Sequence, residues 1–289
     1  MKTKKNLVLN LSVSFIMVIF LSLTGCQDNS GIEDMDVQQL DENTAVEQTE
    51  IDDVSEGING LIDDAYTFAE TPEANKDTAG KDSEAYMPDC VTITKVITGN
   101  TKKVTLDFGE GCTTRNDNTV SGKIIMDYTF AFTGQSITIN YSFEDFYFNG
   151  KKIEGTVNKI RVRVNDNGNP QATITKNIKI IWEDDSFVTV QGERIREWIK
   201  GFGNRIWSDN VFLITGNWTI TNKAGVVRQA TVTEPLRREM ACRFLVSGVI
   251  EITKDGSKLT LDYGDGTCDD LATVNINGTV KEIHIRKRK

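Results

Sequence analysis

The stretch IIMDYTFAFTGQSITINYSF, residues 124–143, decides the fold class. Apolar side chains recur at every second position before Gly134-Gln135, and again after these two residues. A period of two is the spacing of a β-strand with one buried face, and Gly134-Gln135 can turn the chain. The stretch therefore predicts a long β-hairpin with one apolar face. The side chains expected on that face are Ile124, Met126, Tyr128, Phe130, Phe132, Ile137, Ile139, Tyr141 and Phe143.

The same strand-like alternation continues to residue 285. Turn-forming residues such as Asn165–Pro170 separate many of these runs, and no helical period intervenes, which excludes a parallel sheet. The sequence predicts an all-β domain over residues 90–289, an antiparallel meander folded as a sandwich or as a curved half-barrel. The further runs lie at 153–165, 172–182, 186–199, 211–221, 226–234, 242–254, 257–263 and 271–285.

The segment before this domain is strongly acidic. Residues 27–89 contain 19 Asp and Glu against two Lys, whereas residues 90–289 contain 28 Lys and Arg against 23 Asp and Glu. We interpret residues 26–50 as an acidic tether and residues 51–89 as a short helix followed by a polar linker. The helix has an apolar stripe from Ile51 to Phe68, which we expect to pack on the domain, with a partner protein as the alternative.

The N-terminus has the layout of an export signal. Lys2, Lys4 and Lys5 precede an apolar run over residues 7–23, and the chain continues Thr24-Gly25-Cys26. A cysteine at the cleavage point is similar to a bacterial lipoprotein signal, which implies removal of residues 1–25 and lipidation of Cys26. The alternatives are an ordinary cleaved signal and an uncleaved membrane helix.

Four cysteines remain after Cys26, an even number in a chain expected to be exported. This favours disulfides over metal binding or catalysis. Three connectivities can join four cysteines, and proximity favours Cys90–Cys112 and Cys242–Cys268. Zinc is disfavoured because no C-x-x-C spacing occurs and the chain has a single histidine.

Both cysteine pairs have matching surroundings. Residues 104–112 read VTLDFGEGC and residues 259–268 read LTLDYGDGTC, each preceded by a hairpin and an upstream cysteine. We interpret residues 90–125 and 242–285 as one unit used twice, each with its own disulfide. Phe108 and Tyr263 should point inward, and the acids between the glycines should face water. Calcium binding is the alternative for the second loop, which contains Asp262, Asp265, Asp269 and Asp270.

These motifs, the Cys26 signal and residues 232–252 (VTEPLRREMACRFLVSGVIEI) resemble a group of uncharacterised exported lipoproteins of Bacteroidota-type Gram-negative bacteria. The group is distinguished by the repeated L-D-[FY]-G-[ED]-G-(T)-C motif. The resemblance covers most of residues 90–285 and implies neither an activity nor catalytic residues.

Other polar clusters are interpreted structurally. The acidic pairs Glu144-Asp145 and Glu183-Asp184-Asp185 lie beside aromatic residues, a pattern that suits glycoside cleavage, but such runs are more typical of turns. Arg194, Arg196 and Trp198 share one strand face, which predicts cation–π contacts on the sheet surface, with stacking on a sugar or base as the alternative.

We therefore expect an outer-membrane lipoprotein with a structural or binding role and no enzymatic activity, catalytic residues, metal or cofactor. The alternatives are a carrier of a lipid or other apolar ligand in a curved sheet, and a glycan-active enzyme. The expected partners are the membrane, reached through the lipid anchor, and a protein, glycan or apolar ligand; nucleic acid is disfavoured by the acidic N-terminal segment. A packed or a hollow sheet interior would distinguish the hypotheses.

Overall fold

The computed structural model describes residues 39–70, 87–129, 136–204 and 206–285, which belong to one compact unit. The expected signal at 1–25, the anchor Cys26 and most of the tether lie outside the described residues. The turn of the 124–143 hairpin, with Phe130 and Phe132, also lies outside them.

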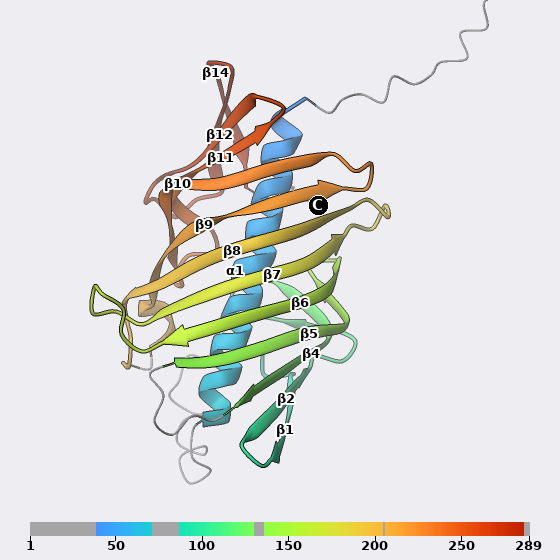
Figure 1. The fold of residues 1–289 in the computed structure, drawn as a ribbon, viewed down its shortest axis with the longest axis vertical. Coiled ribbons are helices and arrows are strands. Elements are labelled where there is room, and N and C mark those ends of the chain that lie inside the picture. Colours follow the sequence, from blue (N-terminus) through green and yellow to red (C-terminus); the bar gives the residue numbers. More distant parts are fainter. Residues whose placement is uncertain (1–38, 71–86, 130–135, 205, 286–289) are drawn as a thin grey trace, which may run out of the picture. The chain divides into compact units, whose positions relative to one another are not determined.

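The described strands form one antiparallel sheet of fourteen strands (Figure 1). Each strand pairs with the next along the chain, except that β2 does not pair with β3. Short β3 pairs only with β4, so that β2 is followed by β4 in the sheet. The all-β meander is confirmed. The strands are β1 (Thr92–Thr98), β2 (Thr101–Asp107), β3 (Cys112–Thr113), β4 (Thr119–Thr129), β5 (Ser136–Phe148), β6 (Lys151–Val162), β7 (Gln171–Ile181), β8 (Phe187–Lys200), β9 (Val211–Asn222), β10 (Val227–Glu239), β11 (Leu245–Lys254), β12 (Ser257–Asp265), β13 (Leu271–Ile276) and β14 (Thr279–His284).

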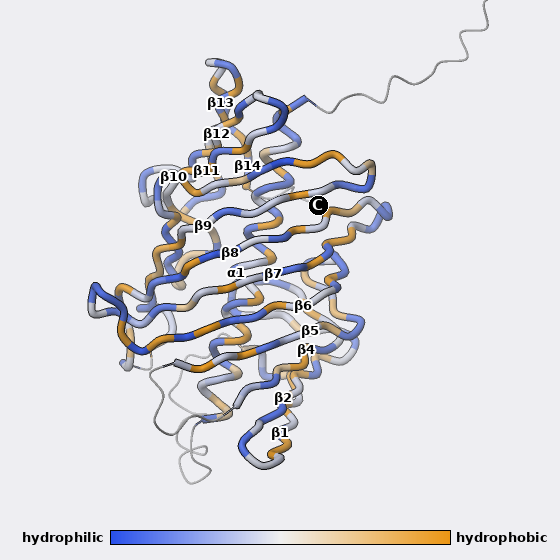
Figure 2. Tube along the Cα trace, viewed as in Figure 1, coloured by the Kyte–Doolittle hydropathy of each residue, from blue (hydrophilic) through white to orange (hydrophobic). Residues whose placement is uncertain are grey.

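A single helix, α1 (Glu42–Glu70), crosses the strands on the inner side of the sheet, and Figure 1 shows it behind β4 to β11. The sheet curves around this helix, so the half-barrel describes the architecture and the two-layer sandwich is wrong. The 29 residues of α1 correspond to a helix length of about 43 Å at 1.5 Å per residue. Buried apolar side chains of α1 and of the inner sheet face form one core. Hydrophobic and hydrophilic residues alternate along the strands (Figure 2).

The helix begins earlier than the sequence predicts. We placed its start at residue 51 and assigned residues 26–50 to a tether, but residues 42–50 are helical. The physical reason is an N-cap at Asp41, whose carboxylate accepts hydrogen bonds from the Thr44 backbone N–H (2.8 Å) and hydroxyl (2.9 Å). The expected packing of the helix on the domain is confirmed.

Glycines allow the sheet to bend and the helix to approach it. Gly192 and Gly216, on neighbouring strands, have φ values of +154° and +131°, and a Cβ at either position would lie within 2.5 Å of the facing strand's backbone. These residues let adjacent strands approach more closely than a side chain permits. On α1, a Cβ at Gly57 would lie 2.1 Å from the ring of buried Phe148. Gly57 therefore gives the Phe148 ring the space that a side chain on the helix would fill.

The repeat is visible in its hairpins and disulfides. Cys90 is joined to Cys112 and Cys242 to Cys268, the two pairs that the repeat predicts, with Cα–Cα distances of 6.0 and 5.7 Å. In both copies the aspartate before the aromatic residue closes a local turn: Asp107 accepts from Gly109 N–H and Asp262 from Gly264 N–H, each at 2.9 Å. The next long strand pairs back onto the motif strand in both copies, β4 on β2 and β13 on β12, and the copies differ in the short β3 that precedes β4.

The inward aromatics and outward acids of the motif are confirmed. Phe108 and Tyr263 are each 2 % exposed, and Glu110 and Asp265 are exposed. In the first copy the motif is thus the end of β2 followed by a turn, whereas in the second copy Gly264 lies in a bulge at the end of β12.

Replacing Gly264 with Val should lower the free energy of unfolding by about 1–3 kcal/mol, because φ is +95° there and no neighbouring atom lies closer than 3.9 Å to the added Cβ. The loss would then come from backbone strain alone. Urea denaturation checks it, with Asp265→Asn as the control at the adjacent exposed position. Equal losses in both variants would contradict the assignment.

Candidate functional site

The interior of the sheet is a charge-complementary interface with α1. The helix contains nine Asp and Glu and no Lys or Arg. Strands β2, β6, β7, β8 and β10 direct cations inward at positions in phase with their buried apolar residues. The inward cations on these strands include Lys102, Lys159, Arg161, Lys176, Arg194, Arg196, Arg228 and Arg238.

The centre of this interface is a buried cluster of two arginines and two acids. Arg194 forms an ion pair with Asp52 and lies 3.7 Å from the Glu56 carboxylate. Arg196 Nε donates to Glu56 at 3.1 Å. All four side chains are at most 4 % exposed, so each charge depends on its partner rather than on water.

Asp63 of α1 binds the cations of β6 and β8. Its carboxylate lies 2.7 Å from Lys159 Nζ and 2.6 Å from Arg196 Nη1, with Arg161 at 3.5 Å. Burial alone would raise the pKa of Asp63, but these three cations hold it well below its usual value. Burial lowers the pKa of Lys159 to about 8, against the opposing effect of Asp63.

Both ends of the helix are held in the same way. Near its N-terminus Glu47 pairs with Arg228, and burial nevertheless raises the pKa of Glu47. At its C-terminus Glu70 accepts from Lys102 Nζ and from the Tyr128 hydroxyl, both at 2.6 Å. Because Lys102 and Tyr128 lie on β2 and β4, and Arg228 lies on β10, the helix connects distant parts of the sheet.

The arginines of β8 also stack on aromatic rings, but in the core rather than on the surface. The Arg194 guanidinium lies 4.0 Å from the Trp218 ring centroid, and that of Arg196 lies 3.4 Å from the Phe212 centroid. Cation–π contacts therefore exist, but their rings belong to β9 and not to Trp198, and the expected surface location is wrong. Lys176 of β7 donates to the Ser55 hydroxyl of α1 at 2.9 Å. Burial lowers the pKa of Lys176 well below its usual value.

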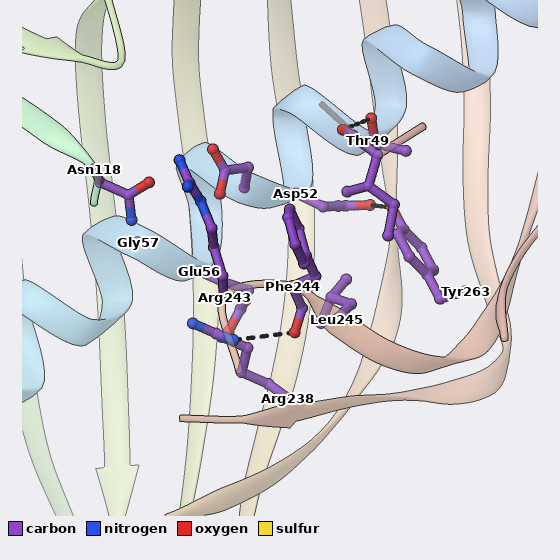
Figure 3. Close-up of a pocket in the computed structure, with 12 residues that line it drawn as sticks. Thr49, Asp52, Glu56, Gly57, Asn118, Arg238, Arg243, Phe244, Leu245 and Tyr263 are labelled. Atoms are coloured by element: carbon purple, nitrogen blue, oxygen red, sulfur yellow. Dashed lines mark hydrogen bonds between the residues drawn. The ribbon is translucent and has the colours of Figure 1, made fainter. Parts of the chain in front are cut away.

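A small polar pocket lies where the β10–β11 loop meets α1 (Figure 3). The Tyr263 hydroxyl donates to Asp52 at 2.5 Å, and burial, followed by the Asp52 charge, raises the pKa of Tyr263 well above its usual value. Arg238 donates to the carbonyl oxygens of Glu239 at 3.0 Å and Phe244 at 3.1 Å. Several of the polar groups that line the pocket thus already bind other protein groups. It is lined by Thr49, Asp52, Asp53, Glu56, Gly57, Asn118, Arg238, Arg243, Phe244, Leu245, Tyr263 and Ile285.

The acidic pairs singled out in the sequence lie elsewhere. Asp184 and Asp185 belong to the tight β7–β8 turn, as expected, with Asp185 at φ +60°. Glu144 and Asp145 are not turn residues: they form a bulge inside β5, where Glu144 pairs with Lys123 at 3.3 Å. The two acidic runs thus belong to different elements, one inside β5 and one in the β7–β8 turn.

The second glycine loop uses its carboxylates locally. Asp265 accepts from Thr267 N–H (3.1 Å), Asp269 from Leu271 N–H (3.0 Å), and Asp270 lies 3.0 Å from the His284 ring. Within the residues that the structure describes, no group of three or more His, Cys, Asp or Glu side chains is arranged to hold a metal.

The sequence analysis missed the buried ion pairs. The alternation of β7 contains a sign of these pairs. It places Lys176 on the same strand face as Ile174 and Ile178, which predicts a buried lysine. The sequence analysis assigned a role to the apolar stripe of α1 and none to the acids beside it. Only the curvature of the sheet brings the two charged faces together.

No protein-family model, curated protein or solved structure matches this chain. Across the described ranges, no helix combines the length and apolar character needed to cross a membrane.

Replacing Asp63 with Asn should lower the free energy of unfolding by about 3 kcal/mol, because Lys159 would remain buried without its counter-charge. Chemical denaturation measures this loss. Adding Lys159→Met should recover part of it, with a coupling energy of about 1–3 kcal/mol. Glu42→Gln is the matched control on the same helix: its ion pair with Lys281 is exposed and should be worth less than about 1 kcal/mol. Additive losses from Asp63 and Lys159 would contradict the pairing.

The low pKa of Asp63 also predicts an acid effect. Since the folded pKa lies below the unfolded value of 3.8, Asp63 stabilises the native state above pH 4 and loses this contribution as the pH falls below that value. Unfolding free energies measured between pH 5 and pH 2 should therefore fall less steeply in Asp63→Asn than in the parent chain. Parallel pH profiles would show that Asp63 is not held ionised by its cations.

Proposed function

We propose that this protein is an outer-membrane lipoprotein of a bacterial cell envelope, anchored through lipid on Cys26, with a non-enzymatic structural or binding role. The basic start, the apolar run and Cys26 support the export and lipidation steps. Two disulfide-linked cysteine pairs in the domain are consistent with an oxidising compartment.

The observation that carries the binding or structural role is the filled interior of the half-barrel. A carrier of apolar ligands needs an apolar cavity, whereas here α1 occupies the inner side of the sheet and its acids are paired with Arg194, Arg196 and Lys159. The proposal that the protein has no enzymatic activity is supported by the contacts of its acidic side chains, which are paired with other protein groups. Asp52, Glu56 and Asp63 neutralise buried cations, and acids nearer the surface such as Asp265 and Glu144 bind a backbone amide or a basic side chain.

The anchor is tested by Cys26→Ala. The variant should leave the membrane fraction and appear in the soluble envelope fraction, because the lipid that retains the parent chain would be missing. Fractionation followed by detergent extraction measures the change, with Cys90→Ala as a control that alters a cysteine outside the signal. Retention of Cys26→Ala in the membrane with unchanged extraction would refute the anchor.

The soluble Cys26→Ala protein also separates the binding role from the carrier alternative. Mass spectrometry of the natively purified protein should find no stoichiometric lipid, because α1 fills the space that a lipid would need. A lipid bound at one equivalent would favour the carrier.

A further inference from the structure

Three exposed apolar side chains gather at one end of strands β6 to β9. Phe202 (58 % exposed) and Ile206 (45 %) follow β8, and Val164 (65 %) follows β6. The two loops are neighbours, since Trp198 N–H donates to the Pro170 carbonyl at 2.8 Å. They lie at the left edge of the sheet in Figure 1. We call Val164, Phe202 and Ile206 the apolar tip.

Phe202 of the apolar tip packs against another aromatic ring. The Trp198 ring lies 5.0 Å from that of Phe202, edge to face, and 5.2 Å from that of buried Phe212. Its indole N–H donates to the Lys200 carbonyl at 2.7 Å. Beside it, the 3-10 turn Trp207–Asp209 follows Ile206. The outward position of Phe202 is therefore held by packing, with half-buried indoles behind it.

We propose that the apolar tip inserts into the interfacial region of the lipid bilayer to which Cys26 anchors the chain. Apolar side chains at a loop tip, backed by indoles that are part apolar and part polar, suit the boundary between headgroups and acyl chains. The contact gives the domain a fixed orientation on the membrane, with Val164, Phe202 and Ile206 facing the lipid.

The length of the tether permits this contact. Thirteen residue steps separate Cys26 from Gln39, a maximum reach of about 45 Å. From Glu42 to Asp63 the helix rises about 32 Å, and Asp63 binds Arg196, two residues before Trp198 on β8. The tip thus lies about 40 Å from the start of α1, within the reach of the tether.

A glycan is a weaker match for the tip. Glycan sites combine rings with free hydrogen-bonding groups, but the amides beside the tip are already bound: Asn165, Asn167 and Asn169 all donate to one oxygen of Glu197, at 2.9 to 3.0 Å. The side chains that remain exposed at the tip itself are a phenyl ring and two β-branched aliphatic groups, which favour lipid.

The test uses the chain with Cys26→Ser, so that no lipid anchor contributes, and vesicles of phosphatidylethanolamine and phosphatidylglycerol. Flotation should show vesicle binding, accompanied by a blue shift of tryptophan fluorescence. Phe202→Ser and Ile206→Ser should each weaken binding about tenfold, because each removes an apolar side chain that would leave water. Val227→Ser is the matched control: Val227 is 49 % exposed and lies at the opposite end of β9 and β10.

Circular dichroism and urea denaturation confirm that the variants fold. The inference is overturned if the parent chain does not bind vesicles, if Val227→Ser weakens binding as much as Phe202→Ser, or if Phe202→Ser abolishes self-association in sedimentation instead. Because the inference rests on the proposed anchor, the two are separated by design. Loss of membrane localisation in Cys26→Ala tests the anchor, and vesicle binding without lipid tests the tip.

Discussion

The pairing between the acids of α1 and the inward cations of the sheet is the constraint on which the rest of the structure depends. Removing an unpaired charge from water costs several kcal/mol, so neither the cation-lined sheet face nor the acidic helix face is stable alone in an enclosed interior. Arg194 with Asp52, and Lys159 with Asp63, satisfy both faces at once. The helix and the curved sheet therefore stabilise each other as one unit.

Charge pairing also determines the position of the helix. An apolar stripe tolerates sliding by a turn, but a shift of α1 by one turn, about 5.4 Å, would leave Asp63 out of reach of Lys159 and Arg196. Glu47 at one end and Glu70 at the other would lose Arg228 and Lys102 in the same movement. Contacts spaced along the whole helix thus define one register, and Gly57 against Phe148 sets its distance from the sheet.

The two disulfide units reinforce this arrangement from both ends of the domain. Cys90–Cys112 and Cys242–Cys268 close the turns in which Phe108 and Tyr263 point inward. Tyr263 then donates to Asp52, so the second unit joins the ion-pair cluster, whereas Phe108 packs against Phe146 at 5.8 Å. The same local unit therefore serves a polar contact in one copy and an apolar contact in the other.

Much of the fold was determined by local sequence. The alternation at 124–143 predicts the meander, and the repeated Asp-aromatic-Gly motif with its cysteines predicts the motif geometry and the cysteine pairs. Both predictions are possible because strand period and turn chemistry act over a few residues. The start of α1 at Asp41 was missed, although its capping side chain is local. Which side chains meet across the interior was decided by the tertiary structure alone. The partners of Lys176 and Asp63 could not be predicted from the sequence, since their burial and pairing depend on contacts between residues more than one hundred positions apart in the chain.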